Sequence, residues 1–376
     1  MQKKIIALAI AGLASTAAFA QTNVTIYGIA DVGIAQVRGN GDLTGTKVIS
    51  GGLSTSRIGF KGVEDLGNGL KALFTLEYRL NPDENVGIGG NGAGGLAAAG
   101  PARQQFVGLT GGFGTAVAGR LQTTGYDWEV KYITLAATAF DIHNQLTVPK
   151  FRINLQNDSR ANNAVAYISP SFGGFSVALN HSFAVEQALS PVASSLNATL
   201  VGLYFDQGPV SVGLVGEKLQ GNGSVGATGF ESTERTDLAL GASFNAGFAK
   251  FTTAIQTTKN NGPKSATENN KFDSVYSIGA QVPVSAKGTV HVQYAQSNYK
   301  SNTLQNDNNG KGIAVAYTHD LSKRTTVYAG FGYLDNSGSG NAYAISGTPN
   351  IPTVGAGIVK PEGSSNVIAT GIRHMF

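Results

Sequence analysis

Residues 56–80 alternate between apolar and polar side chains, and this alternation constrains the fold more than any other feature of the chain. The even positions from 70 onward are Leu70, Ala72, Phe74, Leu76, Tyr78 and Leu80, and the polar odd positions are Lys71, Thr75, Glu77 and Arg79. In the preceding segment Ile58 and Phe60 oppose Arg57 and Lys61. Because successive side chains of a strand point to opposite faces, both segments predict strands with one face suited to lipid and the other to water.

The same alternation recurs along the chain, and no segment shows a sustained helical period. Further alternating segments occur at residues 24–34, 175–183, 238–244, 313–317 and 327–333. Short turns alternate with long polar connections rich in Gly and Asn. The short turns are DLGNG, GGF, SPSFGG, DQGP, NAGF, PVSAKG and LSKR, and the long connections are centred near residues 42, 90, 140, 190, 225, 265, 305 and 348. These seven turns and eight long connections predict sixteen strands.

Residues 1–20 have the pattern of a secretory signal peptide. Two lysines precede an apolar run, and Ala18-Phe19-Ala20 forms a small-x-small cleavage site before Gln21. The pattern predicts export and leaves residues 21–376 as one domain. Because two of the 27 basic residues belong to this segment, the basic excess of the remainder is small, and no nucleic-acid partner is expected.

Composition narrows the class of exported protein. Charged residues make up 13% of the chain, about half of the ~25% usual in soluble domains, and the absence of cysteine excludes a disulfide framework. After the signal peptide no apolar stretch reaches the roughly 20 residues of a spanning helix. A bilayer admits a sheet only when its edges are closed, and about sixteen strands enclose an aqueous channel. The sequence therefore predicts an all-β, 16-stranded antiparallel transmembrane barrel.

Four segments carry a family resemblance: SRIGFKGVEDLGNGLKALFTLE, RQQFVGLTGGFGTAVAGR, the run from Arg160 through SPSFGGF, and the ending GIRHMF. The chain resembles the general trimeric porins of Gram-negative outer membranes, in their β-proteobacterial and neisserial branch. The resemblance implies a homotrimer of barrels, each with its third long loop folded into the pore. It also implies passive diffusion of small hydrophilic solutes and ions, without enzymatic activity, cofactor or metal. The expected partners are outer-membrane lipid, lipopolysaccharide and the barrel assembly machinery.

The resemblance also implies a constriction, in which wall arginines face carboxylates of the in-folded loop at about residues 121–159. The matched wall positions are Arg57, Arg103 and Arg160, and Lys61 and Arg120 extend them. The charged residues of the constriction loop are Asp127, Glu129, Lys131 and Asp141. A basic wall with few acids predicts a weak preference for anions. The alternative interpretation is that these are ordinary solvated residues of a wet wall.

Two features of the chain ends carry further expectations. Phe376 resembles the terminal aromatic that barrel assembly machinery reads in this family, although it could simply be an aromatic residue at the membrane interface. On the outward phase near the start, Gly28 and Ala30 are small enough to admit another protomer, and lipid contact is the alternative.

Other functions stay open at the level of sequence. A substrate-specific porin would build its site from loop residues. An outer-membrane barrel enzyme would need a catalytic constellation, for which His143 with Asp141 is the nearest candidate. A soluble exported β-propeller or sandwich acting as a binding module should not carry aliphatic and aromatic rows on every strand.

Overall fold

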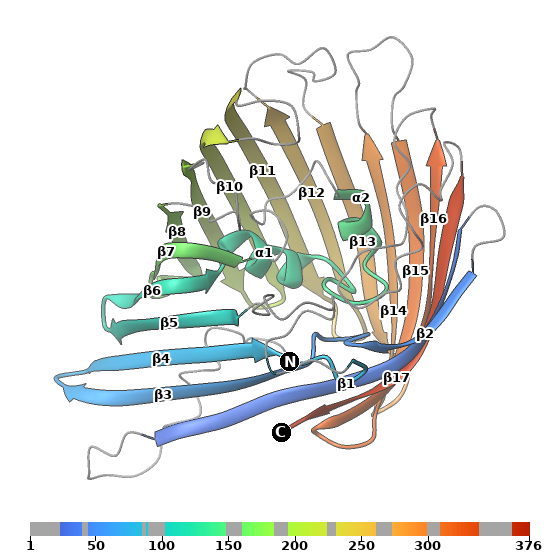
Figure 1. Ribbon diagram of the computed structural model, residues 1–376, viewed down its shortest axis with the longest axis horizontal. Coiled ribbons are helices and arrows are strands. Elements are labelled where there is room, and N and C mark those ends of the chain that lie inside the picture. Colours follow the sequence, from blue (N-terminus) through green and yellow to red (C-terminus); the bar gives the residue numbers. More distant parts are fainter. Residues whose placement is uncertain are drawn as a thin grey trace.

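The computed structural model describes residues 23–39, 44–84, 88, 102–147, 160–183, 195–223, 231–260, 273–298, 309–337 and 363–376. The predicted signal peptide and residues 148–159 of the predicted constriction loop lie outside these ranges. The described chain forms one large curved sheet that encloses two short helices (Figure 1). The strands are β1 (Asn23–Gly39), β2 (Thr44–Ser50), β3 (Arg57–Gly67), β4 (Leu70–Arg79), β5 (Ala102–Gly111), β6 (Gly114–Gln122), β7 (Arg160–Ile168), β8 (Phe175–Ser182), β9 (Ser195–Gln207), β10 (Val210–Gly223), β11 (Glu231–Asn245), β12 (Lys250–Asn260), β13 (Asp273–Pro283), β14 (Gly288–Asn298), β15 (Asn309–Asp320), β16 (Thr325–Ser337) and β17 (Ser364–Met375).

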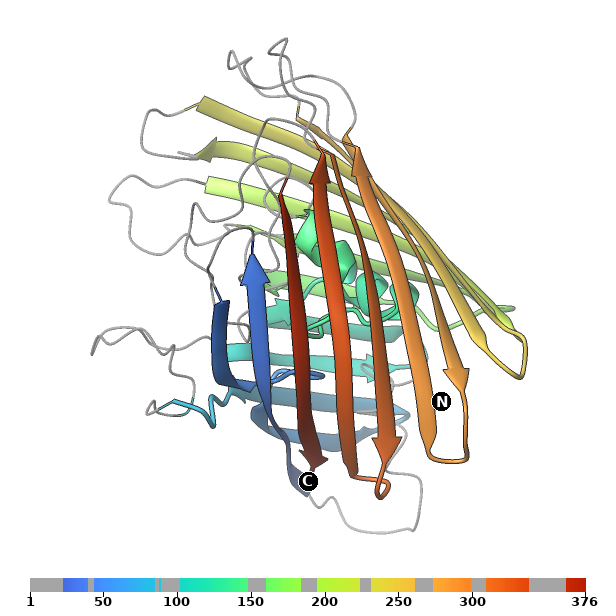
Figure 2. The same cartoon turned by 90° about the vertical axis from the view of Figure 1, so that its right-hand side faces the viewer.

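The sheet is a closed antiparallel barrel of sixteen strand positions. From β3 onward each strand pairs with the next, and β17 pairs with β1 to close the ring (Figure 2). Strands β2 and β3 both lie along the other edge of β1, where β2 pairs with residues 32–38 and β3 with residues 23–29. They are therefore two parts of one strand position, interrupted by residues 51–56. The predicted fold class is confirmed.

All seven predicted short turns join consecutive strands, at the end of the barrel where β17 also ends (Figure 2). One expectation is wrong in detail, because the long connection centred near residue 42 contains β2. The glycines on both sides of TGTKVIS made the whole region read as one loop. Val48 and Ile49 nevertheless point to opposite faces, with Val48 exposed outside and Ile49 fully buried.

The alternation of side chains places an apolar band around the outside of the barrel. In β15 the side chain of Ile313 is 43% exposed, whereas that of its neighbour Ala314 is fully buried. Other strands expose Val, Leu, Ile and Phe side chains in the same way, for example at Ile26, Val107, Leu240 and Ile368. Rows of this size around a whole molecule suit the hydrocarbon of a bilayer and do not suit a soluble propeller or sandwich.

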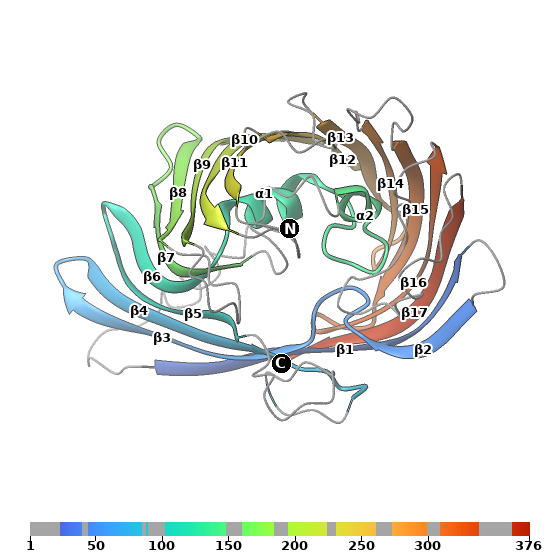
Figure 3. The same ribbon diagram turned by 45° about the horizontal axis from the view of Figure 1, so that its top comes forward.

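The third long connection folds into the lumen, as predicted. It begins after β6 with α1 (Thr124–Tyr132) and continues to α2 (Ile142–Thr147), and both helices lie inside the ring (Figure 3). Thr123 caps α1, because its hydroxyl accepts a hydrogen bond from the Tyr126 N–H at 3.2 Å. Within the described residues, neither helix has the length and apolar character that crossing a membrane requires.

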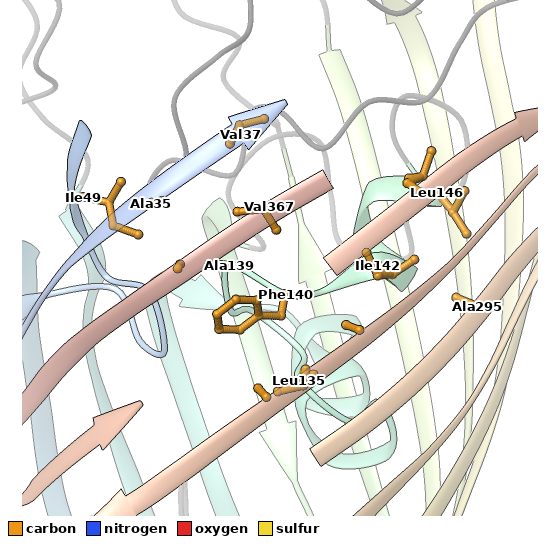
Figure 4. Packing of buried hydrophobic residues seen from close by; sticks show 14 of the residues in the cluster. Ala35, Val37, Ile49, Leu135, Ala139, Phe140, Ile142, Leu146, Ala295 and Val367 are labelled. Atoms are coloured by element: carbon orange, nitrogen blue, oxygen red, sulfur yellow. The ribbon is translucent and has the colours of Figure 1, made fainter. Parts of the chain in front are cut away.

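Glycines on the wall receive the bulky side chains of this loop. Tyr132 lies over Gly213 and Gly241, where an added Cβ would come within 2.5 Å of the ring. Phe140 lies in the same way against Gly330, and Trp128 donates to the Gly213 carbonyl at 3.0 Å. Figure 4 shows Leu135, Phe140 and other loop side chains packed among wall residues in one buried cluster. The loop is therefore fixed along the wall from β10 to β16.

Candidate functional site

Three arginines from different strands gather around one carboxylate of the barrel wall. Glu77 of β4 accepts from Arg103 Nε at 2.7 Å, and its Oε1 lies 3.8 Å from Arg57 Nη1. Its second oxygen, Oε2, accepts from the Tyr27 hydroxyl at 3.1 Å. Arg160 of β7 also interacts electrostatically with Glu77 and with both other arginines. Three guanidinium groups therefore share one wall carboxylate, and the cluster keeps an excess of positive charge.

A β-bulge aims Arg103 into this cluster. Glu77 pairs with Gln104, but the next residue, Tyr78, pairs with Ala102, so Arg103 is the extra residue. Without the bulge, strict alternation would give Arg103 the same phase as Val107 and Leu109, which are exposed on the outside. A bulge shifts the phase of a strand by one residue and can redirect a side chain. Arg103 is accordingly buried against Glu77.

Arg160 connects the wall to the constriction loop. Its guanidinium lies 5.0 Å from the centre of the Tyr126 ring, and its Nη2 donates to Gln122 Oε1 at 3.3 Å. The amide nitrogen of Gln122 in turn donates to Asp127 on α1. Burial raises the pKa of Asp127 to about 6, while the Gln122 hydrogen bond and the charge of Arg160 oppose that rise. Asp127 is thus the loop acid that the described contacts link to the arginines.

The other predicted wall residues, Lys61 and Arg120, contact different groups. Lys61 stands over the Tyr27 ring, 5.2 Å from its centre. Arg120 pairs in register with Gln105 and bonds to the Ala102 carbonyl and to Asn162. Lys131, predicted as a residue of the constriction loop, forms an ion pair with Asp206 at 2.7 Å.

Asp141 has a structural role at the bend of the loop. Residues 134–139, the loop tip, include Leu135 and Ala137 with positive φ angles of 63° and 58°, which are uncommon for residues with a Cβ. The Asp141 carboxylate accepts from the Ala137 N–H at 2.8 Å and from the Asn144 N–H at 3.1 Å. Burial raises the pKa of Asp141 to about 6. Asp141 therefore stabilises the strained tip. Glu129, another predicted residue of the constriction loop, is buried within α1.

His143 does not form a catalytic pair with Asp141. Its Nε2 lies 3.3 Å from Gln256 Oε1, and the Asp141 carboxylate is engaged by backbone N–H groups and by Gln293. Burial lowers the pKa of His143 to about 4 and leaves its side chain closed to solutes. Among the described residues, no group of three or more His, Cys, Asp or Glu could hold a metal ion.

The sequence interpretation identified the three arginines but missed three of their partners. Glu77 lies on the water phase of the opening hairpin, yet its strand position gave no sign that it neutralises arginines of β3 and β5. Tyr27 and Gln122 were missed for the same reason. The signal that could have found Glu77 is a charged residue on the water phase of a strand that lies between two arginine-bearing strands.

The C-terminal residue lies at the seam of the barrel. Gly28 and Phe376 exchange two backbone hydrogen bonds, both at 3.1 Å. The Phe376 ring covers the outer side of Gly28, where an added Cβ would lie 2.3 Å from a ring carbon. The space outside Gly28, which the sequence offered to a second protomer, is thus occupied by the ring of the same chain.

Comparison with known proteins agrees with this architecture. A family model described as Gram-negative porin matches residues 7–339. Outer membrane porin protein 32 of Delftia acidovorans is 33% identical over 393 aligned positions, which cover 100% of both chains. Major outer membrane protein P.IB of Neisseria meningitidis serogroup A is 28% identical over 365 positions, covering 92% of this chain and 97% of that protein.

Solved structures give the same answer. An anion-selective porin from Comamonas acidovorans superposes with a TM-score of 0.74 at 29% identity, covering 95% of this chain and 100% of that one. The trimer form of OmpT from Vibrio cholerae shares the fold, with a TM-score of 0.67 at 16% identity over 94% of this chain and 99% of that one. The closed barrel, its in-folded loop and the match along most of the sequence lead to one conclusion: the chain belongs to the Gram-negative porin family.

Proposed function

We propose that this porin forms a water-filled channel through the outer membrane for passive diffusion of small hydrophilic solutes and ions, with a weak preference for anions. The observation that carries the preference is the cluster of Arg57, Arg103 and Arg160 around the single carboxylate of Glu77. Like charges on the wall of a narrow pore raise the local concentration of counter-ions. The porin from Comamonas acidovorans that shares this fold at 29% identity is described as anion-selective, which supports the same direction.

The constriction lies between this arginine cluster and the constriction loop. On the loop side, the Tyr126 ring lies against Arg160, and Gln122 links Arg160 to Asp127. Opposite charges across a wet gap orient water and disfavour apolar solutes, which cannot replace the lost hydrogen bonds. We therefore expect small polar anions to pass more readily than large or apolar molecules.

Replacement of the three arginines by serine tests the proposal. In planar bilayers under a KCl gradient, the reversal potential of the triple variant should move toward the value for potassium, because the fixed positive charge of the constriction is removed. Arg324→Ser is the matched control, since Arg324 lies in the exposed turn between β15 and β16. A triple variant with the reversal potential of the parent would reject the proposed role of the arginines.

We propose no catalytic activity for the barrel. The nearest catalytic candidate, His143, is buried and bonded to Gln256 rather than oriented by Asp141. A hydrolase assay of the purified protein on short-chain esters and on peptides should give no turnover above buffer, and His143→Ala should leave that baseline unchanged.

We further propose a homotrimer embedded in outer-membrane lipid and lipopolysaccharide, inserted by barrel assembly machinery that reads Phe376. A trimer form is known for a barrel of the same fold. The outward apolar band supports the lipid contact, and the exposed Phe376 ring at the seam supports a role in assembly.

A further inference from the structure

We infer that residues 51–56 form an inward strap that anchors the tip of the constriction loop, and that Asp31 is the positioning residue that gives this strap its shape. The strap is the interruption between β2 and β3, and in Figure 3 the blue chain between these strands turns into the lumen toward the loop. The strap is the last part of the first long connection, and it ends where β3 begins. The inference rests on the proposed channel function, but it does not depend on the anion preference.

Asp31 organises the strap from beneath. Its side chain is fully buried, and its Oδ2 accepts from the backbone N–H groups of Leu53 and Ser54 at 2.9 Å and 2.8 Å. Its Oδ1 accepts from the Gly52 N–H at 3.1 Å and from the Tyr328 hydroxyl at 2.8 Å. A buried carboxylate is tolerated only when hydrogen bonds replace its lost hydration, and four donors do so here. The strap is therefore built around one negative charge.

The main chain of Asp31 and neighbouring side chains secure the ends of the strap. The Asp31 N–H donates to Ser56 Oγ at 2.9 Å, and that hydroxyl donates back to the Asp31 carbonyl at 3.0 Å. The Gly51 N–H donates to the same carbonyl at 2.8 Å, with a φ of 87° that favours glycine. Arg373 of β17 donates to Ser54 Oγ at 3.1 Å. These contacts tie the strap to both strands of the barrel seam.

The strap then holds the tip of the constriction loop. The Ala139 N–H donates to the Gly52 carbonyl at 2.8 Å, and Leu53 packs against the buried cluster that contains Leu135 and Phe140. Leu135, Ala139 and Phe140 point into this cluster beside Ala35 and Val367 of the wall (Figure 4). The tip carries strained backbone at Leu135 and Ala137, so it needs outside contacts to keep one conformation. Loss of the strap should let the tip move into the pore.

Asp31→Asn tests this inference with little change in size. The amide oxygen can still accept from Gly52 and Tyr328, but the amide nitrogen would face the N–H groups of Leu53 and Ser54 and could not accept from them. Single channels of this variant should lose the single open level of the parent and fluctuate between several conductances. Asp65→Asn is the control, because Asp65 is exposed near the end of β3 and its carboxylate accepts from the nearby Gly67 N–H.

A disulfide between the strap and the loop tip should restore the open level of the Asp31→Asn channel. It should not do so if the substitution had destabilised the barrel as a whole. The chain has no cysteine, and a disulfide forms only when two Cα atoms lie within about 7 Å. Leu53 adjoins Gly52, which bonds Ala139, so Leu53→Cys with Ala139→Cys should crosslink. Adding the pair to Asp31→Asn should restore one open level, and reductant should abolish it. A quiet, parent-like Asp31→Asn channel would overturn the inference.

If Asp31→Asn does not assemble, the cysteine pair in the otherwise unchanged chain decides the matter, because failure to crosslink would show that the tip does not rest on the strap. The proposed function fails separately, if the parent protein gives no channel current at all. A channel whose levels respond to the crosslink but whose reversal potential shows no anion preference would support the strap and reject only the preference.

Discussion

Glu77 accepts hydrogen bonds from an arginine and a tyrosine and lies within ion-pair distance of a second arginine, so its negative charge offsets part of the positive charge of the constriction. Glu77→Gln keeps the shape of the side chain and removes that charge. We expect a reversal potential closer to the value for chloride than in the parent. The measurement is a planar-bilayer recording in a KCl gradient, with Glu64→Gln on the exposed part of β3 as control. A shift toward potassium would contradict the assigned direction of the field.

Asp127 predicts a pH dependence of ion preference. Because burial raises its pKa to about 6, the carboxyl is ionised at pH 8 and neutral at pH 5. Acidification therefore removes a negative charge beside Arg160, and anion preference should increase as the pH falls through about 6. Reversal potentials at both pH values test this, and Asp127→Asn should show the stronger preference already at pH 8. A response in Asp127→Asn as large as in the parent would assign the titration to another group.

The sequence named the three arginines that the structure brings together, but it did not predict how they are arranged. Arg57 followed from its own alternation, whereas Arg103 reaches the lumen only through a bulge that period-two reasoning cannot foresee. The roles of Asp127 and Asp141 could not be separated, because both are loop acids. Their difference arises from contacts with residues far away in the sequence, Arg160 for one and Gln293 for the other.

The constriction loop is an element whose shape depends on the wall behind it. Phe140 is fully buried and lies against Gly330, so Phe140→Ala would leave a cavity between the loop and β16. Truncating a buried Phe typically destabilises a protein by about 3–5 kcal/mol. We expect a lower midpoint of denaturant unfolding in detergent and faster proteolysis within the loop.

The matched control for this change is Phe248→Ala, since Phe248 is 70% exposed in the turn between β11 and β12. Equal loss of stability in the two variants would show that Phe140 does not anchor the loop. Retention of the barrel fold can be followed by the heat-dependent change of migration in detergent gels, which separates loop loosening from failure to fold.

The alternation of side chains predicted the strands with one face toward lipid, but it did not predict the segments that turn into the lumen. The seven short turns carry their own glycine, proline and asparagine signals, so their positions followed from local residues. Strand β2 and the strap at residues 51–56 were missed because the region was interpreted as one polar loop. Strand β2 is held by pairing with β1, and the strap by hydrogen bonds to Asp31, so neither follows from local propensity.

For the whole molecule, the seam between β1 and β17 decides whether the barrel closes. Gly28→Val would place side-chain atoms where the Phe376 ring lies, whereas Gly112→Ala adds a Cβ with no atom within 4 Å and serves as control. We expect less heat-modifiable, assembled trimer in membranes for Gly28→Val and for deletion of Phe376. Phe376→Ala combined with Gly28→Val tests the seam packing: recovery would show that the Phe376 ring was the main obstacle, although the added Cβ also lies 2.6 Å from the Arg57 carbonyl.

The overall architecture could be predicted from the sequence because lipid and water impose one repeating pattern on every strand. The family resemblance supplied the in-folded loop, which strand periodicity alone does not indicate. What could not be predicted is the set of contacts across the lumen, such as Trp128 with Gly213 and Ala139 with Gly52, since each joins residues distant in sequence.

The fixing of the constriction loop to glycines of β10–β16 divides the inner surface into two parts with different tolerance to change. On the half formed by β10–β16, a side chain added at Gly213, Gly241 or Gly330 collides with the loop. Substitutions there therefore disturb the packing of the loop before they alter solute preference. The half formed by β3–β7 bears Arg57, Arg103 and Arg160 and meets the loop mainly through Arg160. Substitutions intended to change solute preference should therefore be made on β3–β5. Charged residues can be replaced there while most of the loop keeps its contacts with β10–β16.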